Sequence, residues 1–294
     1  MSFVRYLISG ISLGSVYALI ALGYTMVYGI AKMLNFAHGD VIMIGAFTTY
    51  TICSTLGLPP AVGVLAAVVL CTLLGMGIER IAYKPLRKAA SPLAVLITAI
   101  GVSYLLQNVA LLIFGANTKA FSSVVSISPL VLAGGEITIT GETIVTILSC
   151  IAIMVCLMLF IKKTKAGQAM LAVSEDKGAA QLMGINVNGT IALTFAIGSA
   201  LAAIAGVLLC SAYPSLSPYT GSMPGIKAFV AAVFGGIGSI PGAFIGGIFL
   251  GIVEIFAKAY ISSQMADAIV FAVLIVVLLI KPTGILGKNI QEKV

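Results

Sequence analysis

Apolar residues form long runs along this chain, and short polar stretches separate them. The runs cover about residues 6–30, 41–58, 61–83, 92–114, 142–161, 189–211, 226–260 and 265–281. A helix needs roughly 20 apolar residues to cross the hydrocarbon core of a bilayer. Several runs reach that length, and they lack the short alternating segments of a membrane β-barrel. The pattern predicts one all-α domain over residues 1–294, a polytopic transmembrane bundle of about eight spans.

Two interruptions of this pattern predict discontinuous or re-entrant helices. The run 226–260 is too long for one ordinary span, and 238-GSIPG-242 divides it. The polar stretch 35-NFAHGD-40 precedes another helix, which is expected to start near Val41. Broken helices occur at membrane depth only where protein or a water-filled cavity surrounds them. The residues expected to line a translocation pathway at these breaks are Asn35, His38, Asp40, Gly236 and Gly238.

Asp40 also has a structural interpretation. A carboxylate at the start of a helix accepts hydrogen bonds from the first backbone N–H groups, and Gly39 would supply the turn before it. The two roles are compatible, so both stay open at this point.

Composition and charge favour a membrane protein. Hydrophobic residues make up 60 % of the chain and charged residues 9 %, whereas a soluble domain carries about a quarter charged residues. Most of the sixteen basic residues flank apolar runs, within 80–88, 162–177 and 281–293. Basic residues concentrate on the cytoplasmic side of membrane proteins. The net charge of +7 therefore indicates topology rather than nucleic-acid binding.

The first apolar run begins like a signal peptide, because Arg5 precedes it. It has no clear small-x-small cleavage site and is longer than the apolar core of a signal peptide, so we interpret it as a retained first span. Counting three spans before Lys84 places the N-terminus on the outer side.

The sequence carries few groups that could perform catalysis. It has one histidine, and none of its five cysteines has a metal-binding spacing. GxxxxGK[ST], HExxH and GxGxxG motifs are absent. We therefore expect no enzyme and no bound cofactor or metal, and ATP would have to be hydrolysed by another chain. The most deeply placed acidic residue, Glu254, has Lys258 at i+4 as a local ion-pair partner, which disfavours an ion-coupled pump.

Glycine is abundant, with 32 residues, many of them inside the apolar runs. GxxxG pairs let helix backbones approach closely. We expect them to serve packing within the chain, with a dimer face as the alternative. The pairs are Gly10/Gly14, Gly242/Gly246 and Gly247/Gly251.

The segment 162–188 is a charged island between two apolar runs. Within it, Ser174 is expected to cap a short helix, with Glu175 and Asp176 in the positively polarised first turn. Gly184 is a natural end for that helix.

The predicted short helix has one face of Ala179, Ala180 and Met183. Small residues with one methionine suit insertion into a groove of a partner protein. A helix lying on lipid headgroups is the alternative, but anionic cytoplasmic lipids would repel the acidic first turn. We therefore expect a cytoplasmic docking helix.

The chain also resembles a known protein family. The resemblance rests on five stretches that occur in this order: 33-MLNFAHGDVIMIGAF-47, 84-KPLRKA-89, 167-GQAMLAVSEDKGAAQLMGINV-187, 233-VFGGIGSIPGAFIGG-247 and 281-KPTGILGK-288. The chain resembles a permease subunit of the bacterial branched-chain amino acid ABC importers over essentially its whole length. The resemblance implies a multi-pass protein of the bacterial inner membrane that translocates branched-chain amino acids by alternating access.

The resemblance also implies partners. These are a second related permease, identical or different, two ATPase subunits that bind the ATP, and an extracytoplasmic solute-binding protein. It implies a coupling loop at 167–187 in which Glu175, Ala179, Ala180 and Gly184 correspond to the coupling signature of ABC importers. In this chain the glutamate does not directly precede the alanine pair, which departs from that signature.

Other functions stay open at this stage. The cargo of such a permease could be urea or a short amide instead. A secondary transporter acting alone would need a buried relay of ionisable residues. A membrane-embedded enzyme would need clustered carboxylates or histidines, and a purely structural subunit would need no pathway at all.

Overall fold

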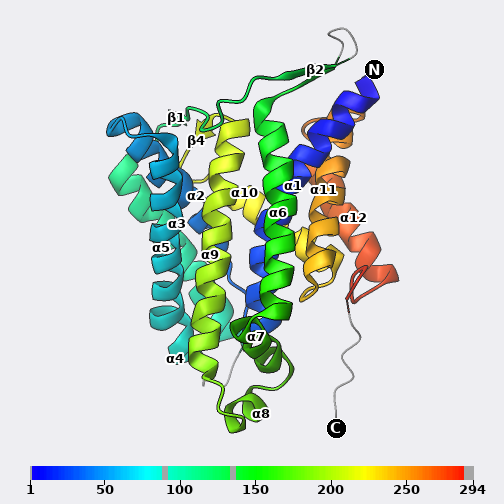
Figure 1. The fold of residues 1–294 in the computed structure, drawn as a ribbon. Coiled ribbons are helices and arrows are strands. Elements are labelled where there is room, and N and C mark those ends of the chain that lie inside the picture. Colours follow the sequence, from blue (N-terminus) through cyan, green and yellow to red (C-terminus); the bar gives the residue numbers. More distant parts are fainter. Residues whose placement is uncertain (1, 88–91, 133–136, 288–294) are drawn as a thin grey trace.

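The computed structural model describes residues 2–87, 92–132 and 137–287, which form a bundle of helices with four very short strands (Figure 1). The predicted cytoplasmic residues Lys88, Lys288 and Lys293 lie outside the described residues. In chain order the elements are α1 (Ser2–Ala31), α2 (His38–Tyr50), the π-helix η1 (Thr51–Thr55), α3 (Pro60–Ile78), the π-helix η2 (Glu79–Tyr83), α4 (Lys84–Leu86), α5 (Pro92–Phe114), β1 (Lys119–Ala120), β2 (Leu130–Leu132), β3 (Ile137–Ile139), α6 (Gly141–Lys163), α7 (Lys165–Glu175), α8 (Lys177–Leu182), α9 (Val187–Ala212), β4 (Ser215–Leu216), α10 (Ser222–Gly235), α11 (Ile240–Tyr260) and α12 (Ala266–Ile280).

The predicted all-α membrane bundle is confirmed. Among the described residues, six helical stretches are long and apolar enough to cross a membrane, and α10 and α12 are shorter apolar helices. The division of the run 226–260 is also confirmed, because α10 ends at Gly235 and α11 starts at Ile240. The six long stretches are α1, α3 continued to Leu86, α5, α6, α9 and α11.

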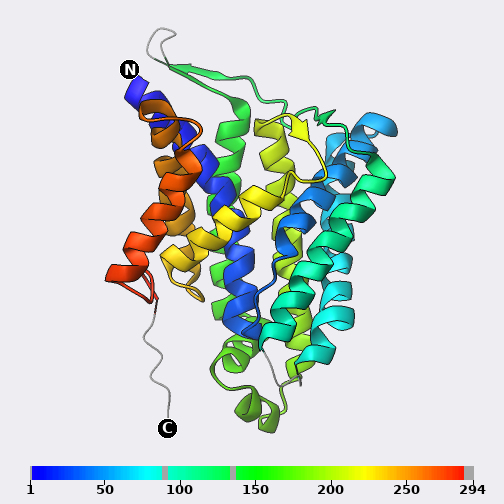
Figure 2. The same cartoon turned by 180° about the vertical axis from the view of Figure 1, so that it is seen from behind.

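Helices α1 and α9 form the centre of the bundle. In each, 72 % of the most apolar window is buried inside the chain, against 11 % for α5. Helix α1 passes through the middle of the bundle in both views and packs against α6, α9, α10 and α11 (Figures 1 and 2). The apolar outer faces of α3, α5 and α6 are left for lipid or another subunit.

Glycine lets α1 and α11 pack with their backbones in contact. A Cβ added at Gly14 would lie 2.7 Å from the Cα and O atoms of Ile248, and one at Gly10 would lie 2.8 Å from the Cα of Ile252. The expectation that the GxxxG pairs serve packing within the chain is therefore confirmed. On the α11 side, Gly247/Gly251 face α1 and Gly242/Gly246 face α10.

The two ends of the bundle differ. Helices α7 and α8 project from one end, and the N-terminus with the antiparallel pair β2–β3 lies at the other (Figure 1). A second antiparallel pair, β1–β4, joins the connection after α5 to the one after α9. The start of α1 and the helices α7 and α8 thus lie at opposite ends of the bundle.

The glycine contact between α1 and α11 can be tested by adding a single methyl group. We expect Gly14→Ala to lower the free energy of unfolding by about 1–3 kcal/mol, because the backbone of Ile248 leaves no room for a Cβ. The measurement is unfolding of the purified protein in detergent. The control is Gly77→Ala in α3, where no other atom lies within 4 Å of the added Cβ. An equal loss at both positions would contradict the role of this contact.

Candidate translocation pathway and coupling helix

The first break in the bundle is the segment 32–37 between α1 and α2. Lys32 adopts φ 57°, a left-handed conformation that is uncommon for a residue with a Cβ, and so ends α1 abruptly. The buried Tyr83 of η2 then holds the segment, because its hydroxyl lies 3.3 Å from the carbonyl oxygen of Leu34 and 3.0 Å from Oδ1 of Asn35. These bonds supply polar partners to a non-helical backbone inside the bundle.

The second break is the turn 236–239 between α10 and α11. Gly236 and Gly238 have φ angles of 102° and 93°, which glycine adopts without strain. Ser239 then caps α11 by accepting a hydrogen bond from the N–H of Gly242 at 3.2 Å.

The segment after α12 satisfies the last carbonyl groups of α10. The N–H groups of Ile285 and Leu286 donate to the carbonyl oxygens of Phe234 and Gly235, both at 2.9 Å. This is the structural role of the stretch 281-KPTGILGK-288, as far as it lies within the described residues.

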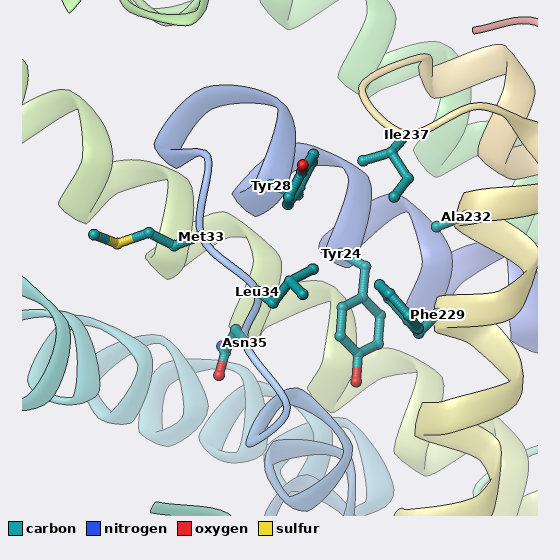
Figure 3. A pocket seen from close by; sticks show the side chains of 8 residues that line it. All are labelled: Tyr24, Tyr28, Met33, Leu34, Asn35, Phe229, Ala232 and Ile237. Atoms are coloured by element: carbon teal, nitrogen blue, oxygen red, sulfur yellow. The ribbon is translucent and has the colours of Figure 1, made fainter. Parts of the chain in front are cut away.

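Both breaks line one pocket (Figure 3). Its empty volume is about 210 Å³, part of it open to solvent, and it leaves no room for a water molecule. Its walls are apolar and aromatic except for one amide and two phenol groups, so it suits an uncharged, apolar group. The lining residues are Tyr24, Tyr28, Met33, Leu34, Asn35, Phe229, Ala232 and Ile237.

The predicted pathway residues separate into two groups. Asn35 lines the pocket, and Gly236 and Gly238 flank its lining residue Ile237. Gly236 itself is buried, and a Cβ there would strike Gly287, so it packs on the C-terminal segment and does not line the pocket. Gly238 is exposed beside Gly29 of α1.

His38 and Asp40 lie in the first turn of α2, and neither is among the residues that line the pocket. The His38 ring packs edge-on against Tyr24, with the ring centroids 4.6 Å apart. Asp40 accepts a hydrogen bond from Nε2 of Gln107 at 2.9 Å. The expectation that Asp40 caps a helix starting near Val41 is wrong, because α2 begins at His38 and Ala37 occupies the cap position. Asp40 instead places a carboxylate in the first turn, where the helix dipole favours it.

The predicted docking helix begins later than expected. The preceding helix α7 continues through Ser174 and Glu175, and the Ser174 hydroxyl donates to the Leu171 carbonyl oxygen within it. Asp176 is the cap of α8, accepting from the N–H groups of Gly178 at 2.7 Å and Ala179 at 3.0 Å. Ser174 is therefore not the cap, and neither acidic residue lies in the first turn of α8.

The C-terminal end of α8 lies where it was predicted, but its outward face differs from the prediction. Gly184 ends the helix as predicted, with φ 82°. Ala179 is exposed, but Ala180 is buried against the bundle, so the expected shared outward face of Ala179, Ala180 and Met183 is wrong. The exposed fraction is 90 % for Leu182 and 82 % for Met183. These two side chains form the outward apolar tip of α8.

A buried ionic network joins α1, α10, α11 and α12. Nζ of Lys227 lies 2.8 Å from Oε1 of Glu254 and 2.6 Å from Oδ1 of Asp267. Tyr17 donates to Oε2 of Glu254 at 2.8 Å. Lys258 contacts Oε1 at 2.6 Å, so the predicted i,i+4 pair is confirmed. The exposed fraction is only 6 % for Lys227 and 1 % for Glu254.

Lys227 was not among the residues predicted from the sequence. The sequence did contain a signal for this residue, because a lysine inside an apolar run requires a polar or charged partner at membrane depth. The partners, however, lie 27 and 40 residues away in the sequence, and no local spacing connects them.

The comparisons with known proteins decide the family. The family model described as "branched-chain amino acid transport system / permease component" matches residues 6–278. The chain belongs to this permease family. It is therefore a multi-pass membrane protein of the branched-chain amino acid transport permeases.

Individual relatives agree with the family. The chain is 46 % identical to the high-affinity branched-chain amino acid transport permease LivH of Escherichia coli K12, over 99 % of this chain and 98 % of the relative. It is 44 % identical to the corresponding permease BraD of Pseudomonas aeruginosa, with the same coverage. Among solved structures, PsaBC from Streptococcus pneumoniae in complex with Fab has a TM-score of 0.50 and 16 % identity, covering 96 % of this chain and 93 % of that one. At that identity the likeness concerns the fold alone.

The buried network can be tested by removing its lysine. We expect Lys227→Met to lower the free energy of unfolding in detergent by about 3 kcal/mol, because it breaks a buried ion pair. The matched variant Lys258→Met should cost about 1 kcal/mol or less, because this side chain is 40 % exposed. Adding Glu254→Gln to Lys227→Met should restore part of the loss. Equal effects of the two lysine variants would contradict the buried network.

Proposed function

We propose that the chain is the transmembrane permease subunit of an ATP-driven importer that moves branched-chain amino acids inward by alternating access. The observation that carries this proposal is the outward apolar tip of α8 at the basic end of the bundle. Two large apolar side chains exposed at that end are costly to leave in water, and a partner protein would cover them.

The energy source must be another chain. The sequence has no phosphate-binding loop, so ATP would be bound and hydrolysed by two ATPase subunits. A groove on one of these two ATPases would receive Leu182 and Met183. Ala180 is buried, so α8 can remain packed against the bundle while the partner binds its tip.

The other proposed partners fit the remaining surfaces. The apolar side chains exposed on α3, α5 and α6 would contact a second, related permease and the surrounding lipid. The opposite end, with the N-terminus and β2–β3, would receive an extracytoplasmic solute-binding protein. Selectivity among cargo molecules would then rest mainly with that protein.

The proposed pathway runs between the two breaks. Its apolar and aromatic walls suit a branched aliphatic side chain, while Asn35 and the hydroxyl groups of Tyr24 and Tyr28 offer hydrogen bonds to polar groups of the cargo. The narrow pocket corresponds to a closed conformation. Each ATPase state would bind one permease conformation more tightly than the other, and this difference would open the pocket to one side at a time.

Transport can be measured with the complete complex in liposomes. Uptake of labelled leucine should require ATP and the binding protein, and excess urea or a short amide should not compete. Competition by an amide would favour the alternative cargo. Leucine uptake by this permease alone, without ATPase subunits or ATP, would contradict the proposal in favour of a secondary transporter.

The docking role of α8 can be tested at its tip. We expect Met183→Glu to reduce ATPase binding and leucine uptake at least about tenfold, because burying a carboxylate in an apolar groove is unfavourable. The control is Leu130→Glu in β2 at the opposite end, an exposed apolar residue whose change should leave ATPase binding unaltered. Co-purification of the ATPase measures binding. Normal binding and uptake in Met183→Glu would refute the docking role.

A further inference from the structure

One side chain connects α8 to the end of α1. Nζ of Lys177, the first residue of α8, donates to the carbonyl oxygen of Ala31 at 2.9 Å, across 146 residues of sequence. Ala31 is the last residue of α1, and the final carbonyl groups of a helix lack partners within the helix. The negative end of the helix dipole also favours an ammonium group there.

The bond to Ala31 lies directly before the first break. Beyond Ala31 the chain turns at Lys32 in its left-handed conformation and enters the segment 32–37. Such a backbone conformation costs free energy and persists only where surrounding contacts hold it. Lys177 provides a contact on one side of the segment and Tyr83 one on the other.

The segment held in this way forms a wall of the pocket. Met33, Leu34 and Asn35 all belong to the lining, and Figure 3 shows the chain passing from one to the next beside Tyr24 and Phe229. A shift of α8 that moves Lys177 would therefore act on the pocket wall within a few residues.

The electrostatic surroundings make this contact easy to release. Burial lowers the pKa of the Lys177 ammonium, and the nearby positive charges of Arg87 and Lys32 lower it further. The neighbouring carboxylate of Glu79 is already paired with Arg87. Within the part of the chain that the structure describes, Lys177 forms no ion pair, so it is attached to α1 by its hydrogen bond to the Ala31 carbonyl oxygen, with the positive charges of Arg87 and Lys32 nearby. A bond of this kind can form in one conformation and break in the other.

We propose that Lys177 is a positioning residue that links α8 to the segment 32–37, so that movement of α8 by the partner opens or closes the pocket. The inference rests on the proposed function of α8 as the docking helix. The tip residues Leu182 and Met183 bind the partner, and Lys177 transmits the resulting movement of α8 to the segment 32–37.

The test uses the complete complex in liposomes with Lys177→Met, which keeps the length of the side chain and removes the charge. We expect ATPase binding to stay as in the wild type, while leucine uptake per ATP hydrolysed falls at least about tenfold, as for loss of a charge-assisted hydrogen bond. Lys177→Arg should restore most of the coupling. The control is Lys165→Met, which removes an exposed lysine from the first turn of α7.

A second readout follows the pocket wall itself. With Met33→Cys, a water-soluble maleimide should label residue 33 at different rates in the nucleotide-free and ATP-trapped complexes, and Lys177→Met should abolish the difference. Normal coupling and nucleotide-dependent labelling in Lys177→Met would overturn the proposal. If that variant fails to assemble, Lys177→Gln decides by the same two readouts. If the wild-type complex transports without ATP, the proposed function fails, and this inference fails with it. If the wild-type complex needs ATP but Lys177→Met behaves like the wild type, this inference alone fails.

Discussion

The backbone at the two breaks cannot meet lipid, and the rest of the bundle is arranged to satisfy it. A carbonyl or N–H group left unpaired in hydrocarbon costs several kcal/mol, about as much as a broken core contact. Tyr83 provides hydrogen bonds for the segment 32–37, and Ile285 and Leu286 provide them for the end of α10. Both breaks, satisfied in this way, line one pocket.

The contacts around this pocket differ in how firmly they are held. Backbone contact through glycines fixes α1 to α11, and the buried network of Lys227 and Glu254 fixes α10 to both. The segment 32–37 and α8 are joined to each other's surroundings by packing and by hydrogen bonds, one of them from a lysine beside other positive charges. A rigid core of α1, α10 and α11 beside a more weakly attached segment 32–37 is the arrangement expected of a gate. A small difference in the partner's binding free energy between two conformations is then enough to move the segment.

The fold was largely predictable from the sequence because apolar runs of membrane length and Gly/Pro interruptions are local signals. Both breaks were predicted on that basis, but at 35–40 and 238–242, two or three residues later than the breaks at 32–37 and 236–239 in the structure. The start of α8 was not predictable, since Ser174 and Asp176 are both good caps. The buried residues Met170 and Val173 keep α7 helical past Ser174, and that depends on tertiary packing. The partners of Lys227 and the hydrogen bond of Lys177 join distant segments, which no spacing reveals.

Passage of cargo between the two breaks can be tested by cross-linking one break to the other. In the complete complex, Leu34→Cys and Ile237→Cys would be bridged by a short bifunctional thiol reagent, with each single variant as control. Both residues line the same pocket. We expect the bridge to stop ATP-dependent leucine uptake and a reductant to restore it, while either single variant keeps transporting. Normal uptake by the bridged complex would contradict a pathway between the breaks.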